Sequence, residues 1–115
     1  MEVKRWEDEP VEELSPLIGR QVVHTEKMTV ARIVLQAGAA VPRHEHVHEQ
    51  VANVLEGSLR FVVGDEERVV AAGESVFIPS GVPHTVEALT DAVVLDLFAP
   101  VRDDWVRGDD AYLRG

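Results

Sequence analysis

The fold of this chain is decided by the stretch GAAVPRHEHVHEQVANVLEG, residues 38–57, and by its counterpart GESVFIPSGVPH, residues 73–84. The first stretch holds three histidines within five residues, and the second ends on His84. Neutral imidazole is the commonest protein ligand for divalent transition metals. A cluster of histidines followed by one histidine far along the sequence therefore predicts that the fold brings two chain segments together around one metal ion.

Around these stretches, short apolar runs separated by glycine and proline predict strands. The expected strands cover residues 28–36, 51–55, 59–63, 68–70, 75–78, 86–88 and 93–98. Residues 59–63 alternate with the period of a half-buried strand, and Gly64-Asp65 is a hairpin signal. Since no helical stripe separates the runs, we expect an all-β sandwich or barrel, with a short N-terminal arm over 1–20 and a polar tail over 103–115.

The composition limits the classes of partner. At 115 residues and 45% hydrophobic content, the chain is expected to form one domain, 1–115. Its 11 basic and 21 acidic residues give a net charge of −10, which argues against a nucleic-acid or anionic-lipid surface. Without cysteine, any metal must use nitrogen and oxygen ligands. Since no apolar stretch reaches about 18 residues, we expect a cytoplasmic protein with no membrane partner.

The histidine run also predicts local geometry. Side chains two residues apart in a strand point the same way, so His44 and His46 can bind one ion together. Strict alternation would add His48 and Gln50, and a bend must separate some of the four because one straight strand cannot bring them all to a single ion. The run also matches H-E-x-x-H, but that zinc-protease signature needs a helix, and Pro42 and the β-like run that follows count against one.

The spacing resembles that of the cupin superfamily. Gly38-x5-His44-x-His46-x3-Gln50-x6-Gly57 resembles its first motif, within 38–57, and Gly73-x5-Pro79-x-Gly81-x2-His84 resembles its second, within 73–88. The resemblance implies a small antiparallel jelly-roll barrel with a metal in its mouth. It assigns one divalent transition metal (Zn, Ni, Mn, Fe or Co) to the ligands His44, His46, Gln50 and His84.

The sequence leaves two alternatives for each of two residues beside these ligands, His48 and Glu49. His48 is not at a ligand position of the motif, so it either lines the pocket and contacts substrate or is exposed. Glu49 would replace Gln50 as the ligand if the register were shifted by one residue. A neutral glutamine ligand leaves the full divalent charge on the ion, which strengthens it as a Lewis acid and favours non-redox chemistry.

The chain from Pro42 to Trp105 is similar to the small cupins of pectin degradation, which act on 4,5-unsaturated uronate monosaccharides. It shares their H-x-H-x-H-E-Q run and a late strand, residues 95–100, that is followed by an arginine and acidic residues before an aromatic. The resemblance implies a sugar isomerase or lyase that opens the ring of an acidic sugar to its linear keto form. The alternatives are an Fe(II) oxygenase and a non-catalytic module that binds a small molecule.

Four further residues are candidates for the chemistry. Residues 94, 96 and 98 share one face of their strand, and if that face lines the cavity, Asp96 is a catalytic acid or base. The alternative is that Asp96 caps a bulge or pairs with Arg60 or Arg102.

Arg102 is the candidate that orients the uronate carboxylate, unless it forms a surface ion pair with Asp103 or Asp104. Phe98 and Trp105 are candidates for an apolar wall against the substrate, or else for core packing. A homodimer is also expected, because open sheet edges need cover and the family often pairs barrels through the terminal strands.

Overall fold

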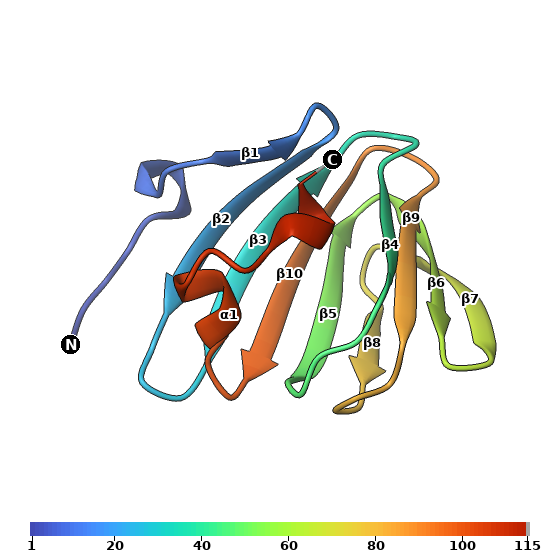
Figure 1. Cartoon of the computed structure of the whole chain (residues 1–115). Helices are drawn as coiled ribbons and strands as arrows, with labels where there is room; N and C mark the ends of the chain where they lie inside the picture. Colours follow the sequence, from blue (N-terminus) through green and yellow to red (C-terminus); the bar gives the residue numbers. More distant parts are fainter. Residues whose placement is uncertain (115) are drawn as a thin grey trace.

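The computed structural model describes residues 1–114 and shows ten strands in two antiparallel sheets (Figure 1). The six-stranded sheet has the order β1 (Glu12–Ser15), β2 (Ile18–His24), β3 (Thr29–Leu35), β10 (Ala92–Ala99), β5 (Glu49–Glu56) and β8 (Ser75–Ile78). The four-stranded sheet has the order β4 (Ala40–His44), β9 (His84–Ala88), β6 (Ser58–Val63) and β7 (Glu66–Ala71). The prediction of an all-β jelly-roll barrel is confirmed.

The core fills one end of the space between the sheets. Its fully buried side chains include Val54 and Leu59, and Phe61 from β6 is almost as deeply enclosed. A smaller apolar cluster of Ala31 and Phe98 with Trp105 lies apart from this core. The two clusters leave a cavity between the sheets that the candidate site residues line.

Every expected strand is present, but three strands escaped prediction: β1, β2 and β4. Strand β2 contains the buried polar residues Arg20 and Gln21, which conceal its apolar alternation. Both bond to residues distant in the sequence, Arg20 to the Asp110 carboxylate and Gln21 to the carbonyl of Glu9. The expected N-terminal arm over 1–20 therefore contains β1 and the start of β2.

Three short helical turns complete the chain: η1 (Trp6–Asp8), α1 (Asp103–Val106) and η2 (Ala111–Leu113). Figure 1 shows α1 and η2 lying in front of β3 and β10. The expected polar tail, 103–115, is thus folded against the barrel as far as the described residues reach, and we call residues 103–114 the C-terminal segment. Within residues 1–114, no helix has the length and apolar character needed to cross a bilayer.

Gly57 shows why the motif needs glycine between β5 and β6. Its φ is +80°, in the left-handed region that side-chain-bearing residues avoid. A Cβ at this position would also overlap the carbonyl oxygen of Asp91. This close approach brings the β5–β6 turn against the start of β10, which helps to fix the strand that carries Asp96.

Candidate metal and substrate site

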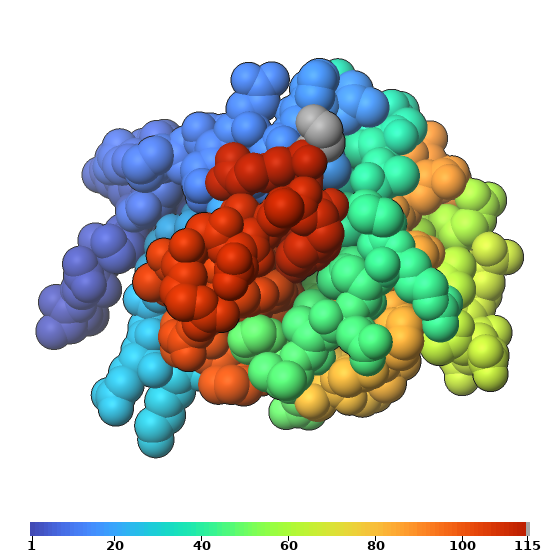
Figure 2. All heavy atoms as spheres, in the orientation of Figure 1, coloured from blue at the N-terminus to red at the C-terminus, as the bar shows by residue number. Residues whose placement is uncertain are grey.

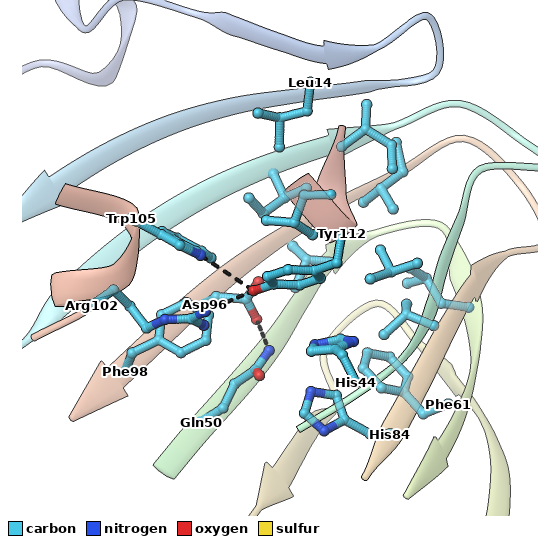
Figure 3. Close-up of a pocket in the computed structure, with 18 residues that line it drawn as sticks. Leu14, His44, Gln50, Phe61, His84, Asp96, Phe98, Arg102, Trp105 and Tyr112 are labelled. Carbon is cyan, nitrogen blue, oxygen red and sulfur yellow. Dashed lines mark hydrogen bonds between the residues drawn. The ribbon is translucent and has the colours of Figure 1, made fainter. Parts of the chain in front are cut away.

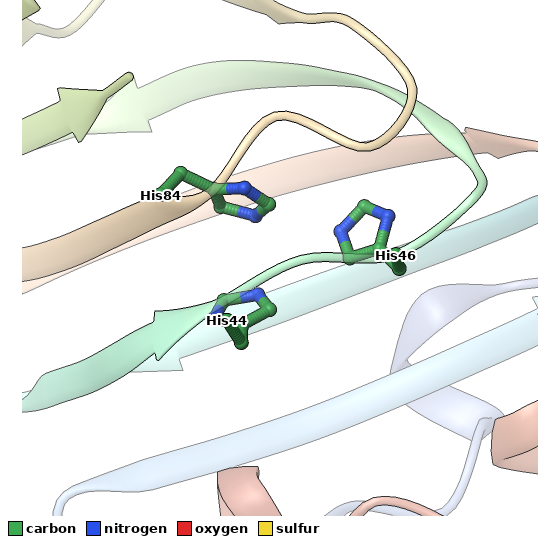
Figure 4. Close-up of side chains that lie close together, drawn as sticks. All are labelled: His44, His46 and His84. Atoms are coloured by element: carbon green, nitrogen blue, oxygen red, sulfur yellow. The ribbon is translucent and has the colours of Figure 1, made fainter. Parts of the chain in front are cut away.

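Three histidine side chains converge between the sheets (Figure 4). His44 ends β4 and lies opposite His84, the first residue of β9, in the antiparallel ladder. His46 follows β4, before the bend at residues 47 and 48. One ring nitrogen from each histidine lies within 4.8 Å of the corresponding atoms of the other two. The structure therefore brings the cluster and the distant histidine together, as the sequence predicted.

The hydrogen bonds of these rings leave one nitrogen of each for a ligand. The Nδ1 atoms bond to backbone carbonyl oxygens: His44 to Pro42 at 2.8 Å, His46 to His48 at 3.1 Å and His84 to Val82 at 2.9 Å. A carbonyl only accepts, so Nδ1 carries the proton and Nε2 keeps its lone pair. The Nε2 atoms of His46 and His84 are buried and have no hydrogen-bond partner among the described residues.

Burial keeps these imidazoles in the neutral form that binds metal. It lowers the pKa of His44 and of His46 from 6.5 to about 4, and it also lowers the pKa of His84. The positive charge of Arg102 adds to the effect at all three rings. At neutral pH no proton has to leave these rings before an ion binds.

Gln50 lines the same cavity from β5 (Figure 3). Its Nε2 donates a hydrogen bond of 3.0 Å to Oδ1 of Asp96, on β10. The amide oxygen Oε1 is then the Gln50 atom available as a ligand. Glu49 is exposed and lies beside Ala99 on the other face of the sheet, so the alternative with Glu49 as ligand does not fit.

These residues fit one divalent transition metal. Three neutral imidazoles and one amide oxygen form a nitrogen- and oxygen-rich ligand set that Zn, Ni, Mn, Fe and Co all accept. The carbonyl bonds to Nδ1 are the outer contacts that hold metal-binding histidines in orientation. His44, His46 and His84 therefore could hold a metal ion, by geometry as well as by residue type.

Asp96 lies in the cavity wall, on the face of β10 that it shares with Val94 and Phe98. Val94, Asp96 and Phe98 all line the cavity, as the shared-face argument required. Burial raises the pKa of the Asp96 carboxyl from 3.8 to about 7, against the opposing effects of the Gln50 hydrogen bond and the Arg102 charge. Within residues 1–114, Asp96 forms no ion pair with Arg60 or Arg102, so its carboxylate is not neutralised by the partners considered from the sequence.

Arg102 is buried, with 1% of its surface exposed, and its guanidinium is held from several sides. Nε and Nη2 donate to the two carboxylate oxygens of Asp104 at 2.9 and 2.7 Å. Nη2 also bonds to the Tyr112 hydroxyl at 2.7 Å, and the guanidinium lies 4.2 Å from the centre of the Trp105 ring. The ion pair with Asp104 is thus present, but in the cavity wall rather than on the surface. Nη1 makes no hydrogen bond within the described residues.

The aromatic candidates and His48 take different places. Phe98 and Trp105 line the cavity, with their ring centres 5.0 Å apart. Phe98 also packs edge-on against His46 at 5.8 Å. His48 is buried but does not line the cavity, and its Nε2 lies 4.0 Å from Oδ1 of Asp104. His48 is therefore positioned to act on the Arg102–Asp104 pair rather than on the cavity contents.

Tyr112 belongs to the site, and sequence reasoning missed it. Its ring lies 4.6 Å from that of His44, and its hydroxyl accepts a 3.2 Å hydrogen bond from the Trp105 indole. The only signal was an aromatic residue in a polar tail. Asp110 fastens this part of the chain by bonds to Arg20 at 2.8 Å and Arg114 at 3.0 Å.

The C-terminal segment covers the cavity. In Figure 2 its red atoms spread across the face of the molecule between the blue N-terminal strands and the green residues that follow β4. Beneath it the cavity has a volume of about 60 Å³. Most small-molecule pockets measure roughly 300–1,000 Å³, so this cavity is too small for a ligand of more than a few atoms.

Comparison with known proteins assigns the family. Residues 31–98 match the cupin domain, and this chain belongs to the cupin family. It is 28% identical over 103 residues to the pectin degradation protein KdgF of Dickeya dadantii, an alignment that covers 87% of this chain and 94% of the relative.

Two solved structures extend the likeness to three dimensions. KdgF from a Halomonas species superposes with a TM-score of 0.81 at 28% identity, covering 86% of this chain and 94% of that one. An RmlC-like cupin from Shewanella frigidimarina superposes with a TM-score of 0.86, also at 28% identity, covering 91% of this chain and 96% of that one. The whole barrel, beyond the two motifs, is therefore shared.

Proposed function

We propose that this cupin holds one divalent transition metal with His44, His46, His84 and Gln50 and opens the ring of a 4,5-unsaturated uronate monosaccharide to its linear keto form. The observation that carries the proposal is the buried Asp96 carboxylate, one hydrogen bond from Gln50 and in the cavity that His44 and His84 line. Similarity along most of the chain to pectin degradation proteins named KdgF supports the substrate class.

The proposed reaction is an isomerisation that moves one proton. The anomeric hydroxyl loses its proton as the bond between the anomeric carbon and the ring oxygen breaks, which leaves an aldehyde at the anomeric carbon and an enolate at the former ring oxygen. The enolate takes up that proton on carbon and becomes a ketone. A bound metal would supply Lewis-acid polarisation of a substrate oxygen. Asp96 would accept and return the proton through Oδ2, because Oδ1 is engaged by Gln50. A pKa of about 7 suits both transfers near neutral pH.

The surrounding residues would orient the sugar. Arg102 offers Nη1 to the uronate carboxylate while Asp104 and Tyr112 hold its other nitrogens. Phe98 and Trp105 provide an apolar wall beside it. The ion pair with Asp104 orients the Arg102 guanidinium through Nε and Nη2 and leaves Nη1 without a partner among the described residues. Arg102 can therefore keep this ion pair while Nη1 binds the substrate carboxylate.

Binding of a monosaccharide would require the C-terminal segment to move, because the cavity measures only about 60 Å³. Trp105 and Tyr112, which line the cavity from this segment, would then close over the substrate and exclude water. The contacts that hold the segment are mostly ion pairs and hydrogen bonds, such as that of Asp110 with Arg20, and water can replace them as they open.

The test is an assay of metal-loaded protein with monomeric 4,5-unsaturated galacturonate, following loss of the ring-alkene ultraviolet absorbance above the spontaneous rate. We expect acceleration that a chelator abolishes. Asp96→Asn should lose it while retaining the metal content of the wild type, and Asp65→Asn, in the exposed β6–β7 turn, should keep it. No acceleration by a fully metal-loaded wild type would contradict the proposal and favour another substrate or a binding role. Full activity of Asp96→Asn would remove Asp96 from the mechanism.

A further inference from the structure

Tyr112 is the single tyrosine of the chain, and its hydroxyl lies between two hydrogen-bond donors of the candidate site (Figure 3). Arg102 Nη2 donates to this oxygen at 2.7 Å, and the Trp105 indole donates to it at 3.2 Å. Within residues 1–114 the hydroxyl itself donates no hydrogen bond. A hydroxyl can both donate and accept, whereas a carboxylate only accepts. Tyr112 is therefore bound here in the way that an oxygen of a carboxylate would be.

The hydroxyl uses a donor that a carboxylate ligand needs. A guanidinium has five N–H donors, one on Nε and two on each of its other nitrogens. In Arg102, Nε and one N–H of Nη2 bind Asp104, and the second N–H of Nη2 binds Tyr112. One carboxylate oxygen of a ligand can therefore bind Nη1 while Tyr112 stays in place. The two-bond contact that arginine typically makes with a carboxylate requires Nη2 as well, and Tyr112 must release it.

The aromatic ring of Tyr112 occupies space beside the histidine cluster. Its centre lies 4.6 Å from that of the His44 ring, and both residues line the cavity. In Figure 3 the ring lies between Arg102 and His44. The cavity volume of about 60 Å³ is what remains with the ring in this position. A monosaccharide that reaches from Arg102 to a metal ion held by His44 therefore needs space that the ring now occupies.

A buried ion pair outside the cavity holds the ring in this position. Tyr112 lies in the short turn η2, in which the backbone N–H of Leu113 donates to the Asp110 carbonyl at 3.0 Å. The Asp110 carboxylate accepts a 2.8 Å bond from Arg20, and both side chains are only 3% exposed. Neither Asp110 nor Arg20 lines the cavity. Because Asp110 and Tyr112 belong to one turn, withdrawal of the ring from the cavity pulls on this ion pair.

We propose that Tyr112 is an internal competitor for the ligand site: in the ligand-free protein its hydroxyl occupies the position of one carboxylate oxygen, and an acidic ligand must displace it to bind Arg102 with two bonds. A ligand hydroxyl would only equal the bond that it displaces. A carboxylate gains a charge-assisted bond, roughly twice as strong, which offsets the displacement. Tyr112 then covers the ligand from further out. The inference rests on the proposed function for the role of Arg102, but it requires no turnover.

Calorimetric titration of the metal-loaded protein with D-galacturonate tests the competition. This saturated sugar acid carries the carboxylate but has no ring alkene, so the proposed ketone cannot form. Tyr112→Phe keeps the ring and frees both donors, so we expect it to bind galacturonate at least fivefold more tightly than the wild type, the equivalent of one hydrogen bond of about 1 kcal/mol. A hydroxyl that only contacted the ligand would have the opposite effect, since its loss would weaken binding.

Asp110→Asn tests the anchor without changing the cavity wall. It weakens the ion pair with Arg20, so it should also tighten binding of galacturonate, by at least twofold. Asp109→Asn is the matched control, because Asp109 is the neighbouring carboxylate of the same segment and its ion pair with Arg107 is exposed. This control removes the same charge and should leave the affinity unchanged. The pair of variants keeps the proposal testable if Tyr112→Phe fails to fold.

The displacement itself can be followed because the chain has only one tyrosine. Wild-type protein that carries 3-fluorotyrosine and is loaded with Zn²⁺ has its fluorine label at Tyr112 alone. We expect saturating galacturonate to move the fluorine NMR resonance toward its position in urea-unfolded protein, because the ring moves away from His44.

The proposal is wrong if Tyr112→Phe binds galacturonate no more tightly than the wild type, or if saturating galacturonate leaves the fluorine resonance in place. Absence of galacturonate binding to both proteins would also overturn it. Equal gains in Asp109→Asn and Asp110→Asn would assign the effect to lost negative charge and remove the anchor. Tighter binding without turnover of the unsaturated sugar would leave the competition standing and overturn the proposed reaction, and turnover without tighter binding would do the reverse.

Discussion

The buried Asp96 carboxyl makes the stability of the metal-free protein depend on pH, and one substitution tests this. Its pKa is about 7 in the folded protein, against an ordinary value of 3.8. Between these values the unfolded chain has lost a proton that the folded protein still holds, so the free energy of unfolding falls as pH rises. The cost is absent below 3.8 and complete above 7.

The magnitude follows from the difference between the two pKa values. Each pKa unit is worth about 1.4 kcal/mol, so full ionisation of Asp96 lowers the free energy of unfolding by about 4 kcal/mol. Asp96→Asn keeps the size of the side chain and an oxygen for the Gln50 hydrogen bond, but it removes the charge. We expect the variant to match the wild type within about 1 kcal/mol at pH 4 and to exceed it by about 4 kcal/mol at pH 8.

The measurement is urea unfolding of both proteins in chelator from pH 4 to pH 8. Burial lowers the pKa values of His44, His46 and His84, so their contribution to stability is lost as pH falls below 6.5, the opposite trend. Because both proteins contain these histidines, their contribution largely cancels in the difference between the two curves. The control variant Asp65→Asn should have the same free energy of unfolding as the wild type at every pH from 4 to 8. A difference between Asp96→Asn and the wild type that does not change with pH, or that grows toward acid, would refute the reasoning.

Three further predictions concern the metal, the motif and the C-terminal segment. A divalent metal at 100 times its dissociation constant should stabilise the wild type by about 2.7 kcal/mol in calorimetry; His84→Ala should abolish this gain and His48→Ala should keep it. Gly57→Ala should lower the free energy of unfolding, measured in urea, by more than about 2 kcal/mol. Gly73 also has a positive φ but has open space around it, so Gly73→Ala should lower this free energy by only about 1 kcal/mol. Equal losses in the two variants would contradict the overlap with Asp91. Tyr112→Phe should cost about 1–3 kcal/mol through the hydrogen bonds that Arg102 and Trp105 lose, and an unchanged unfolding midpoint would contradict this.

The sequence predicted the barrel and the histidine cluster because both depend on local patterns. Strand alternation and the turn glycines act over a few residues, and the spacing of the two motifs fixed His44, His46 and His84 to within the observed cluster. The same alternation put Asp96 on one face with Val94 and Phe98, and the structure shows that this face lines the cavity. In each case the side-chain direction follows from the strand itself, without knowledge of what packs on it.

The residues that escaped prediction are those whose roles depend on distant partners. Arg20 conceals strand β2 because a charged residue within a strand signals exposure, yet it is buried against Asp110, 90 positions along the chain. Tyr112 has no periodic context, and only the path of the C-terminal segment brings it onto His44. Pairings of this kind are set by the folded topology, which a one-dimensional pattern does not contain.

The places where this chain departs from ordinary packing rules are the places that suggest function. Leaving a buried nitrogen such as Nε2 of His84 without a partner costs about 1–3 kcal/mol, and burying Asp96 adds a cost of similar size or larger. A fold selected for stability alone would replace both side chains with apolar ones, as it does at Val94 beside them. Because the costs fall on groups that line one cavity, an ion and a substrate bound there would offset them together.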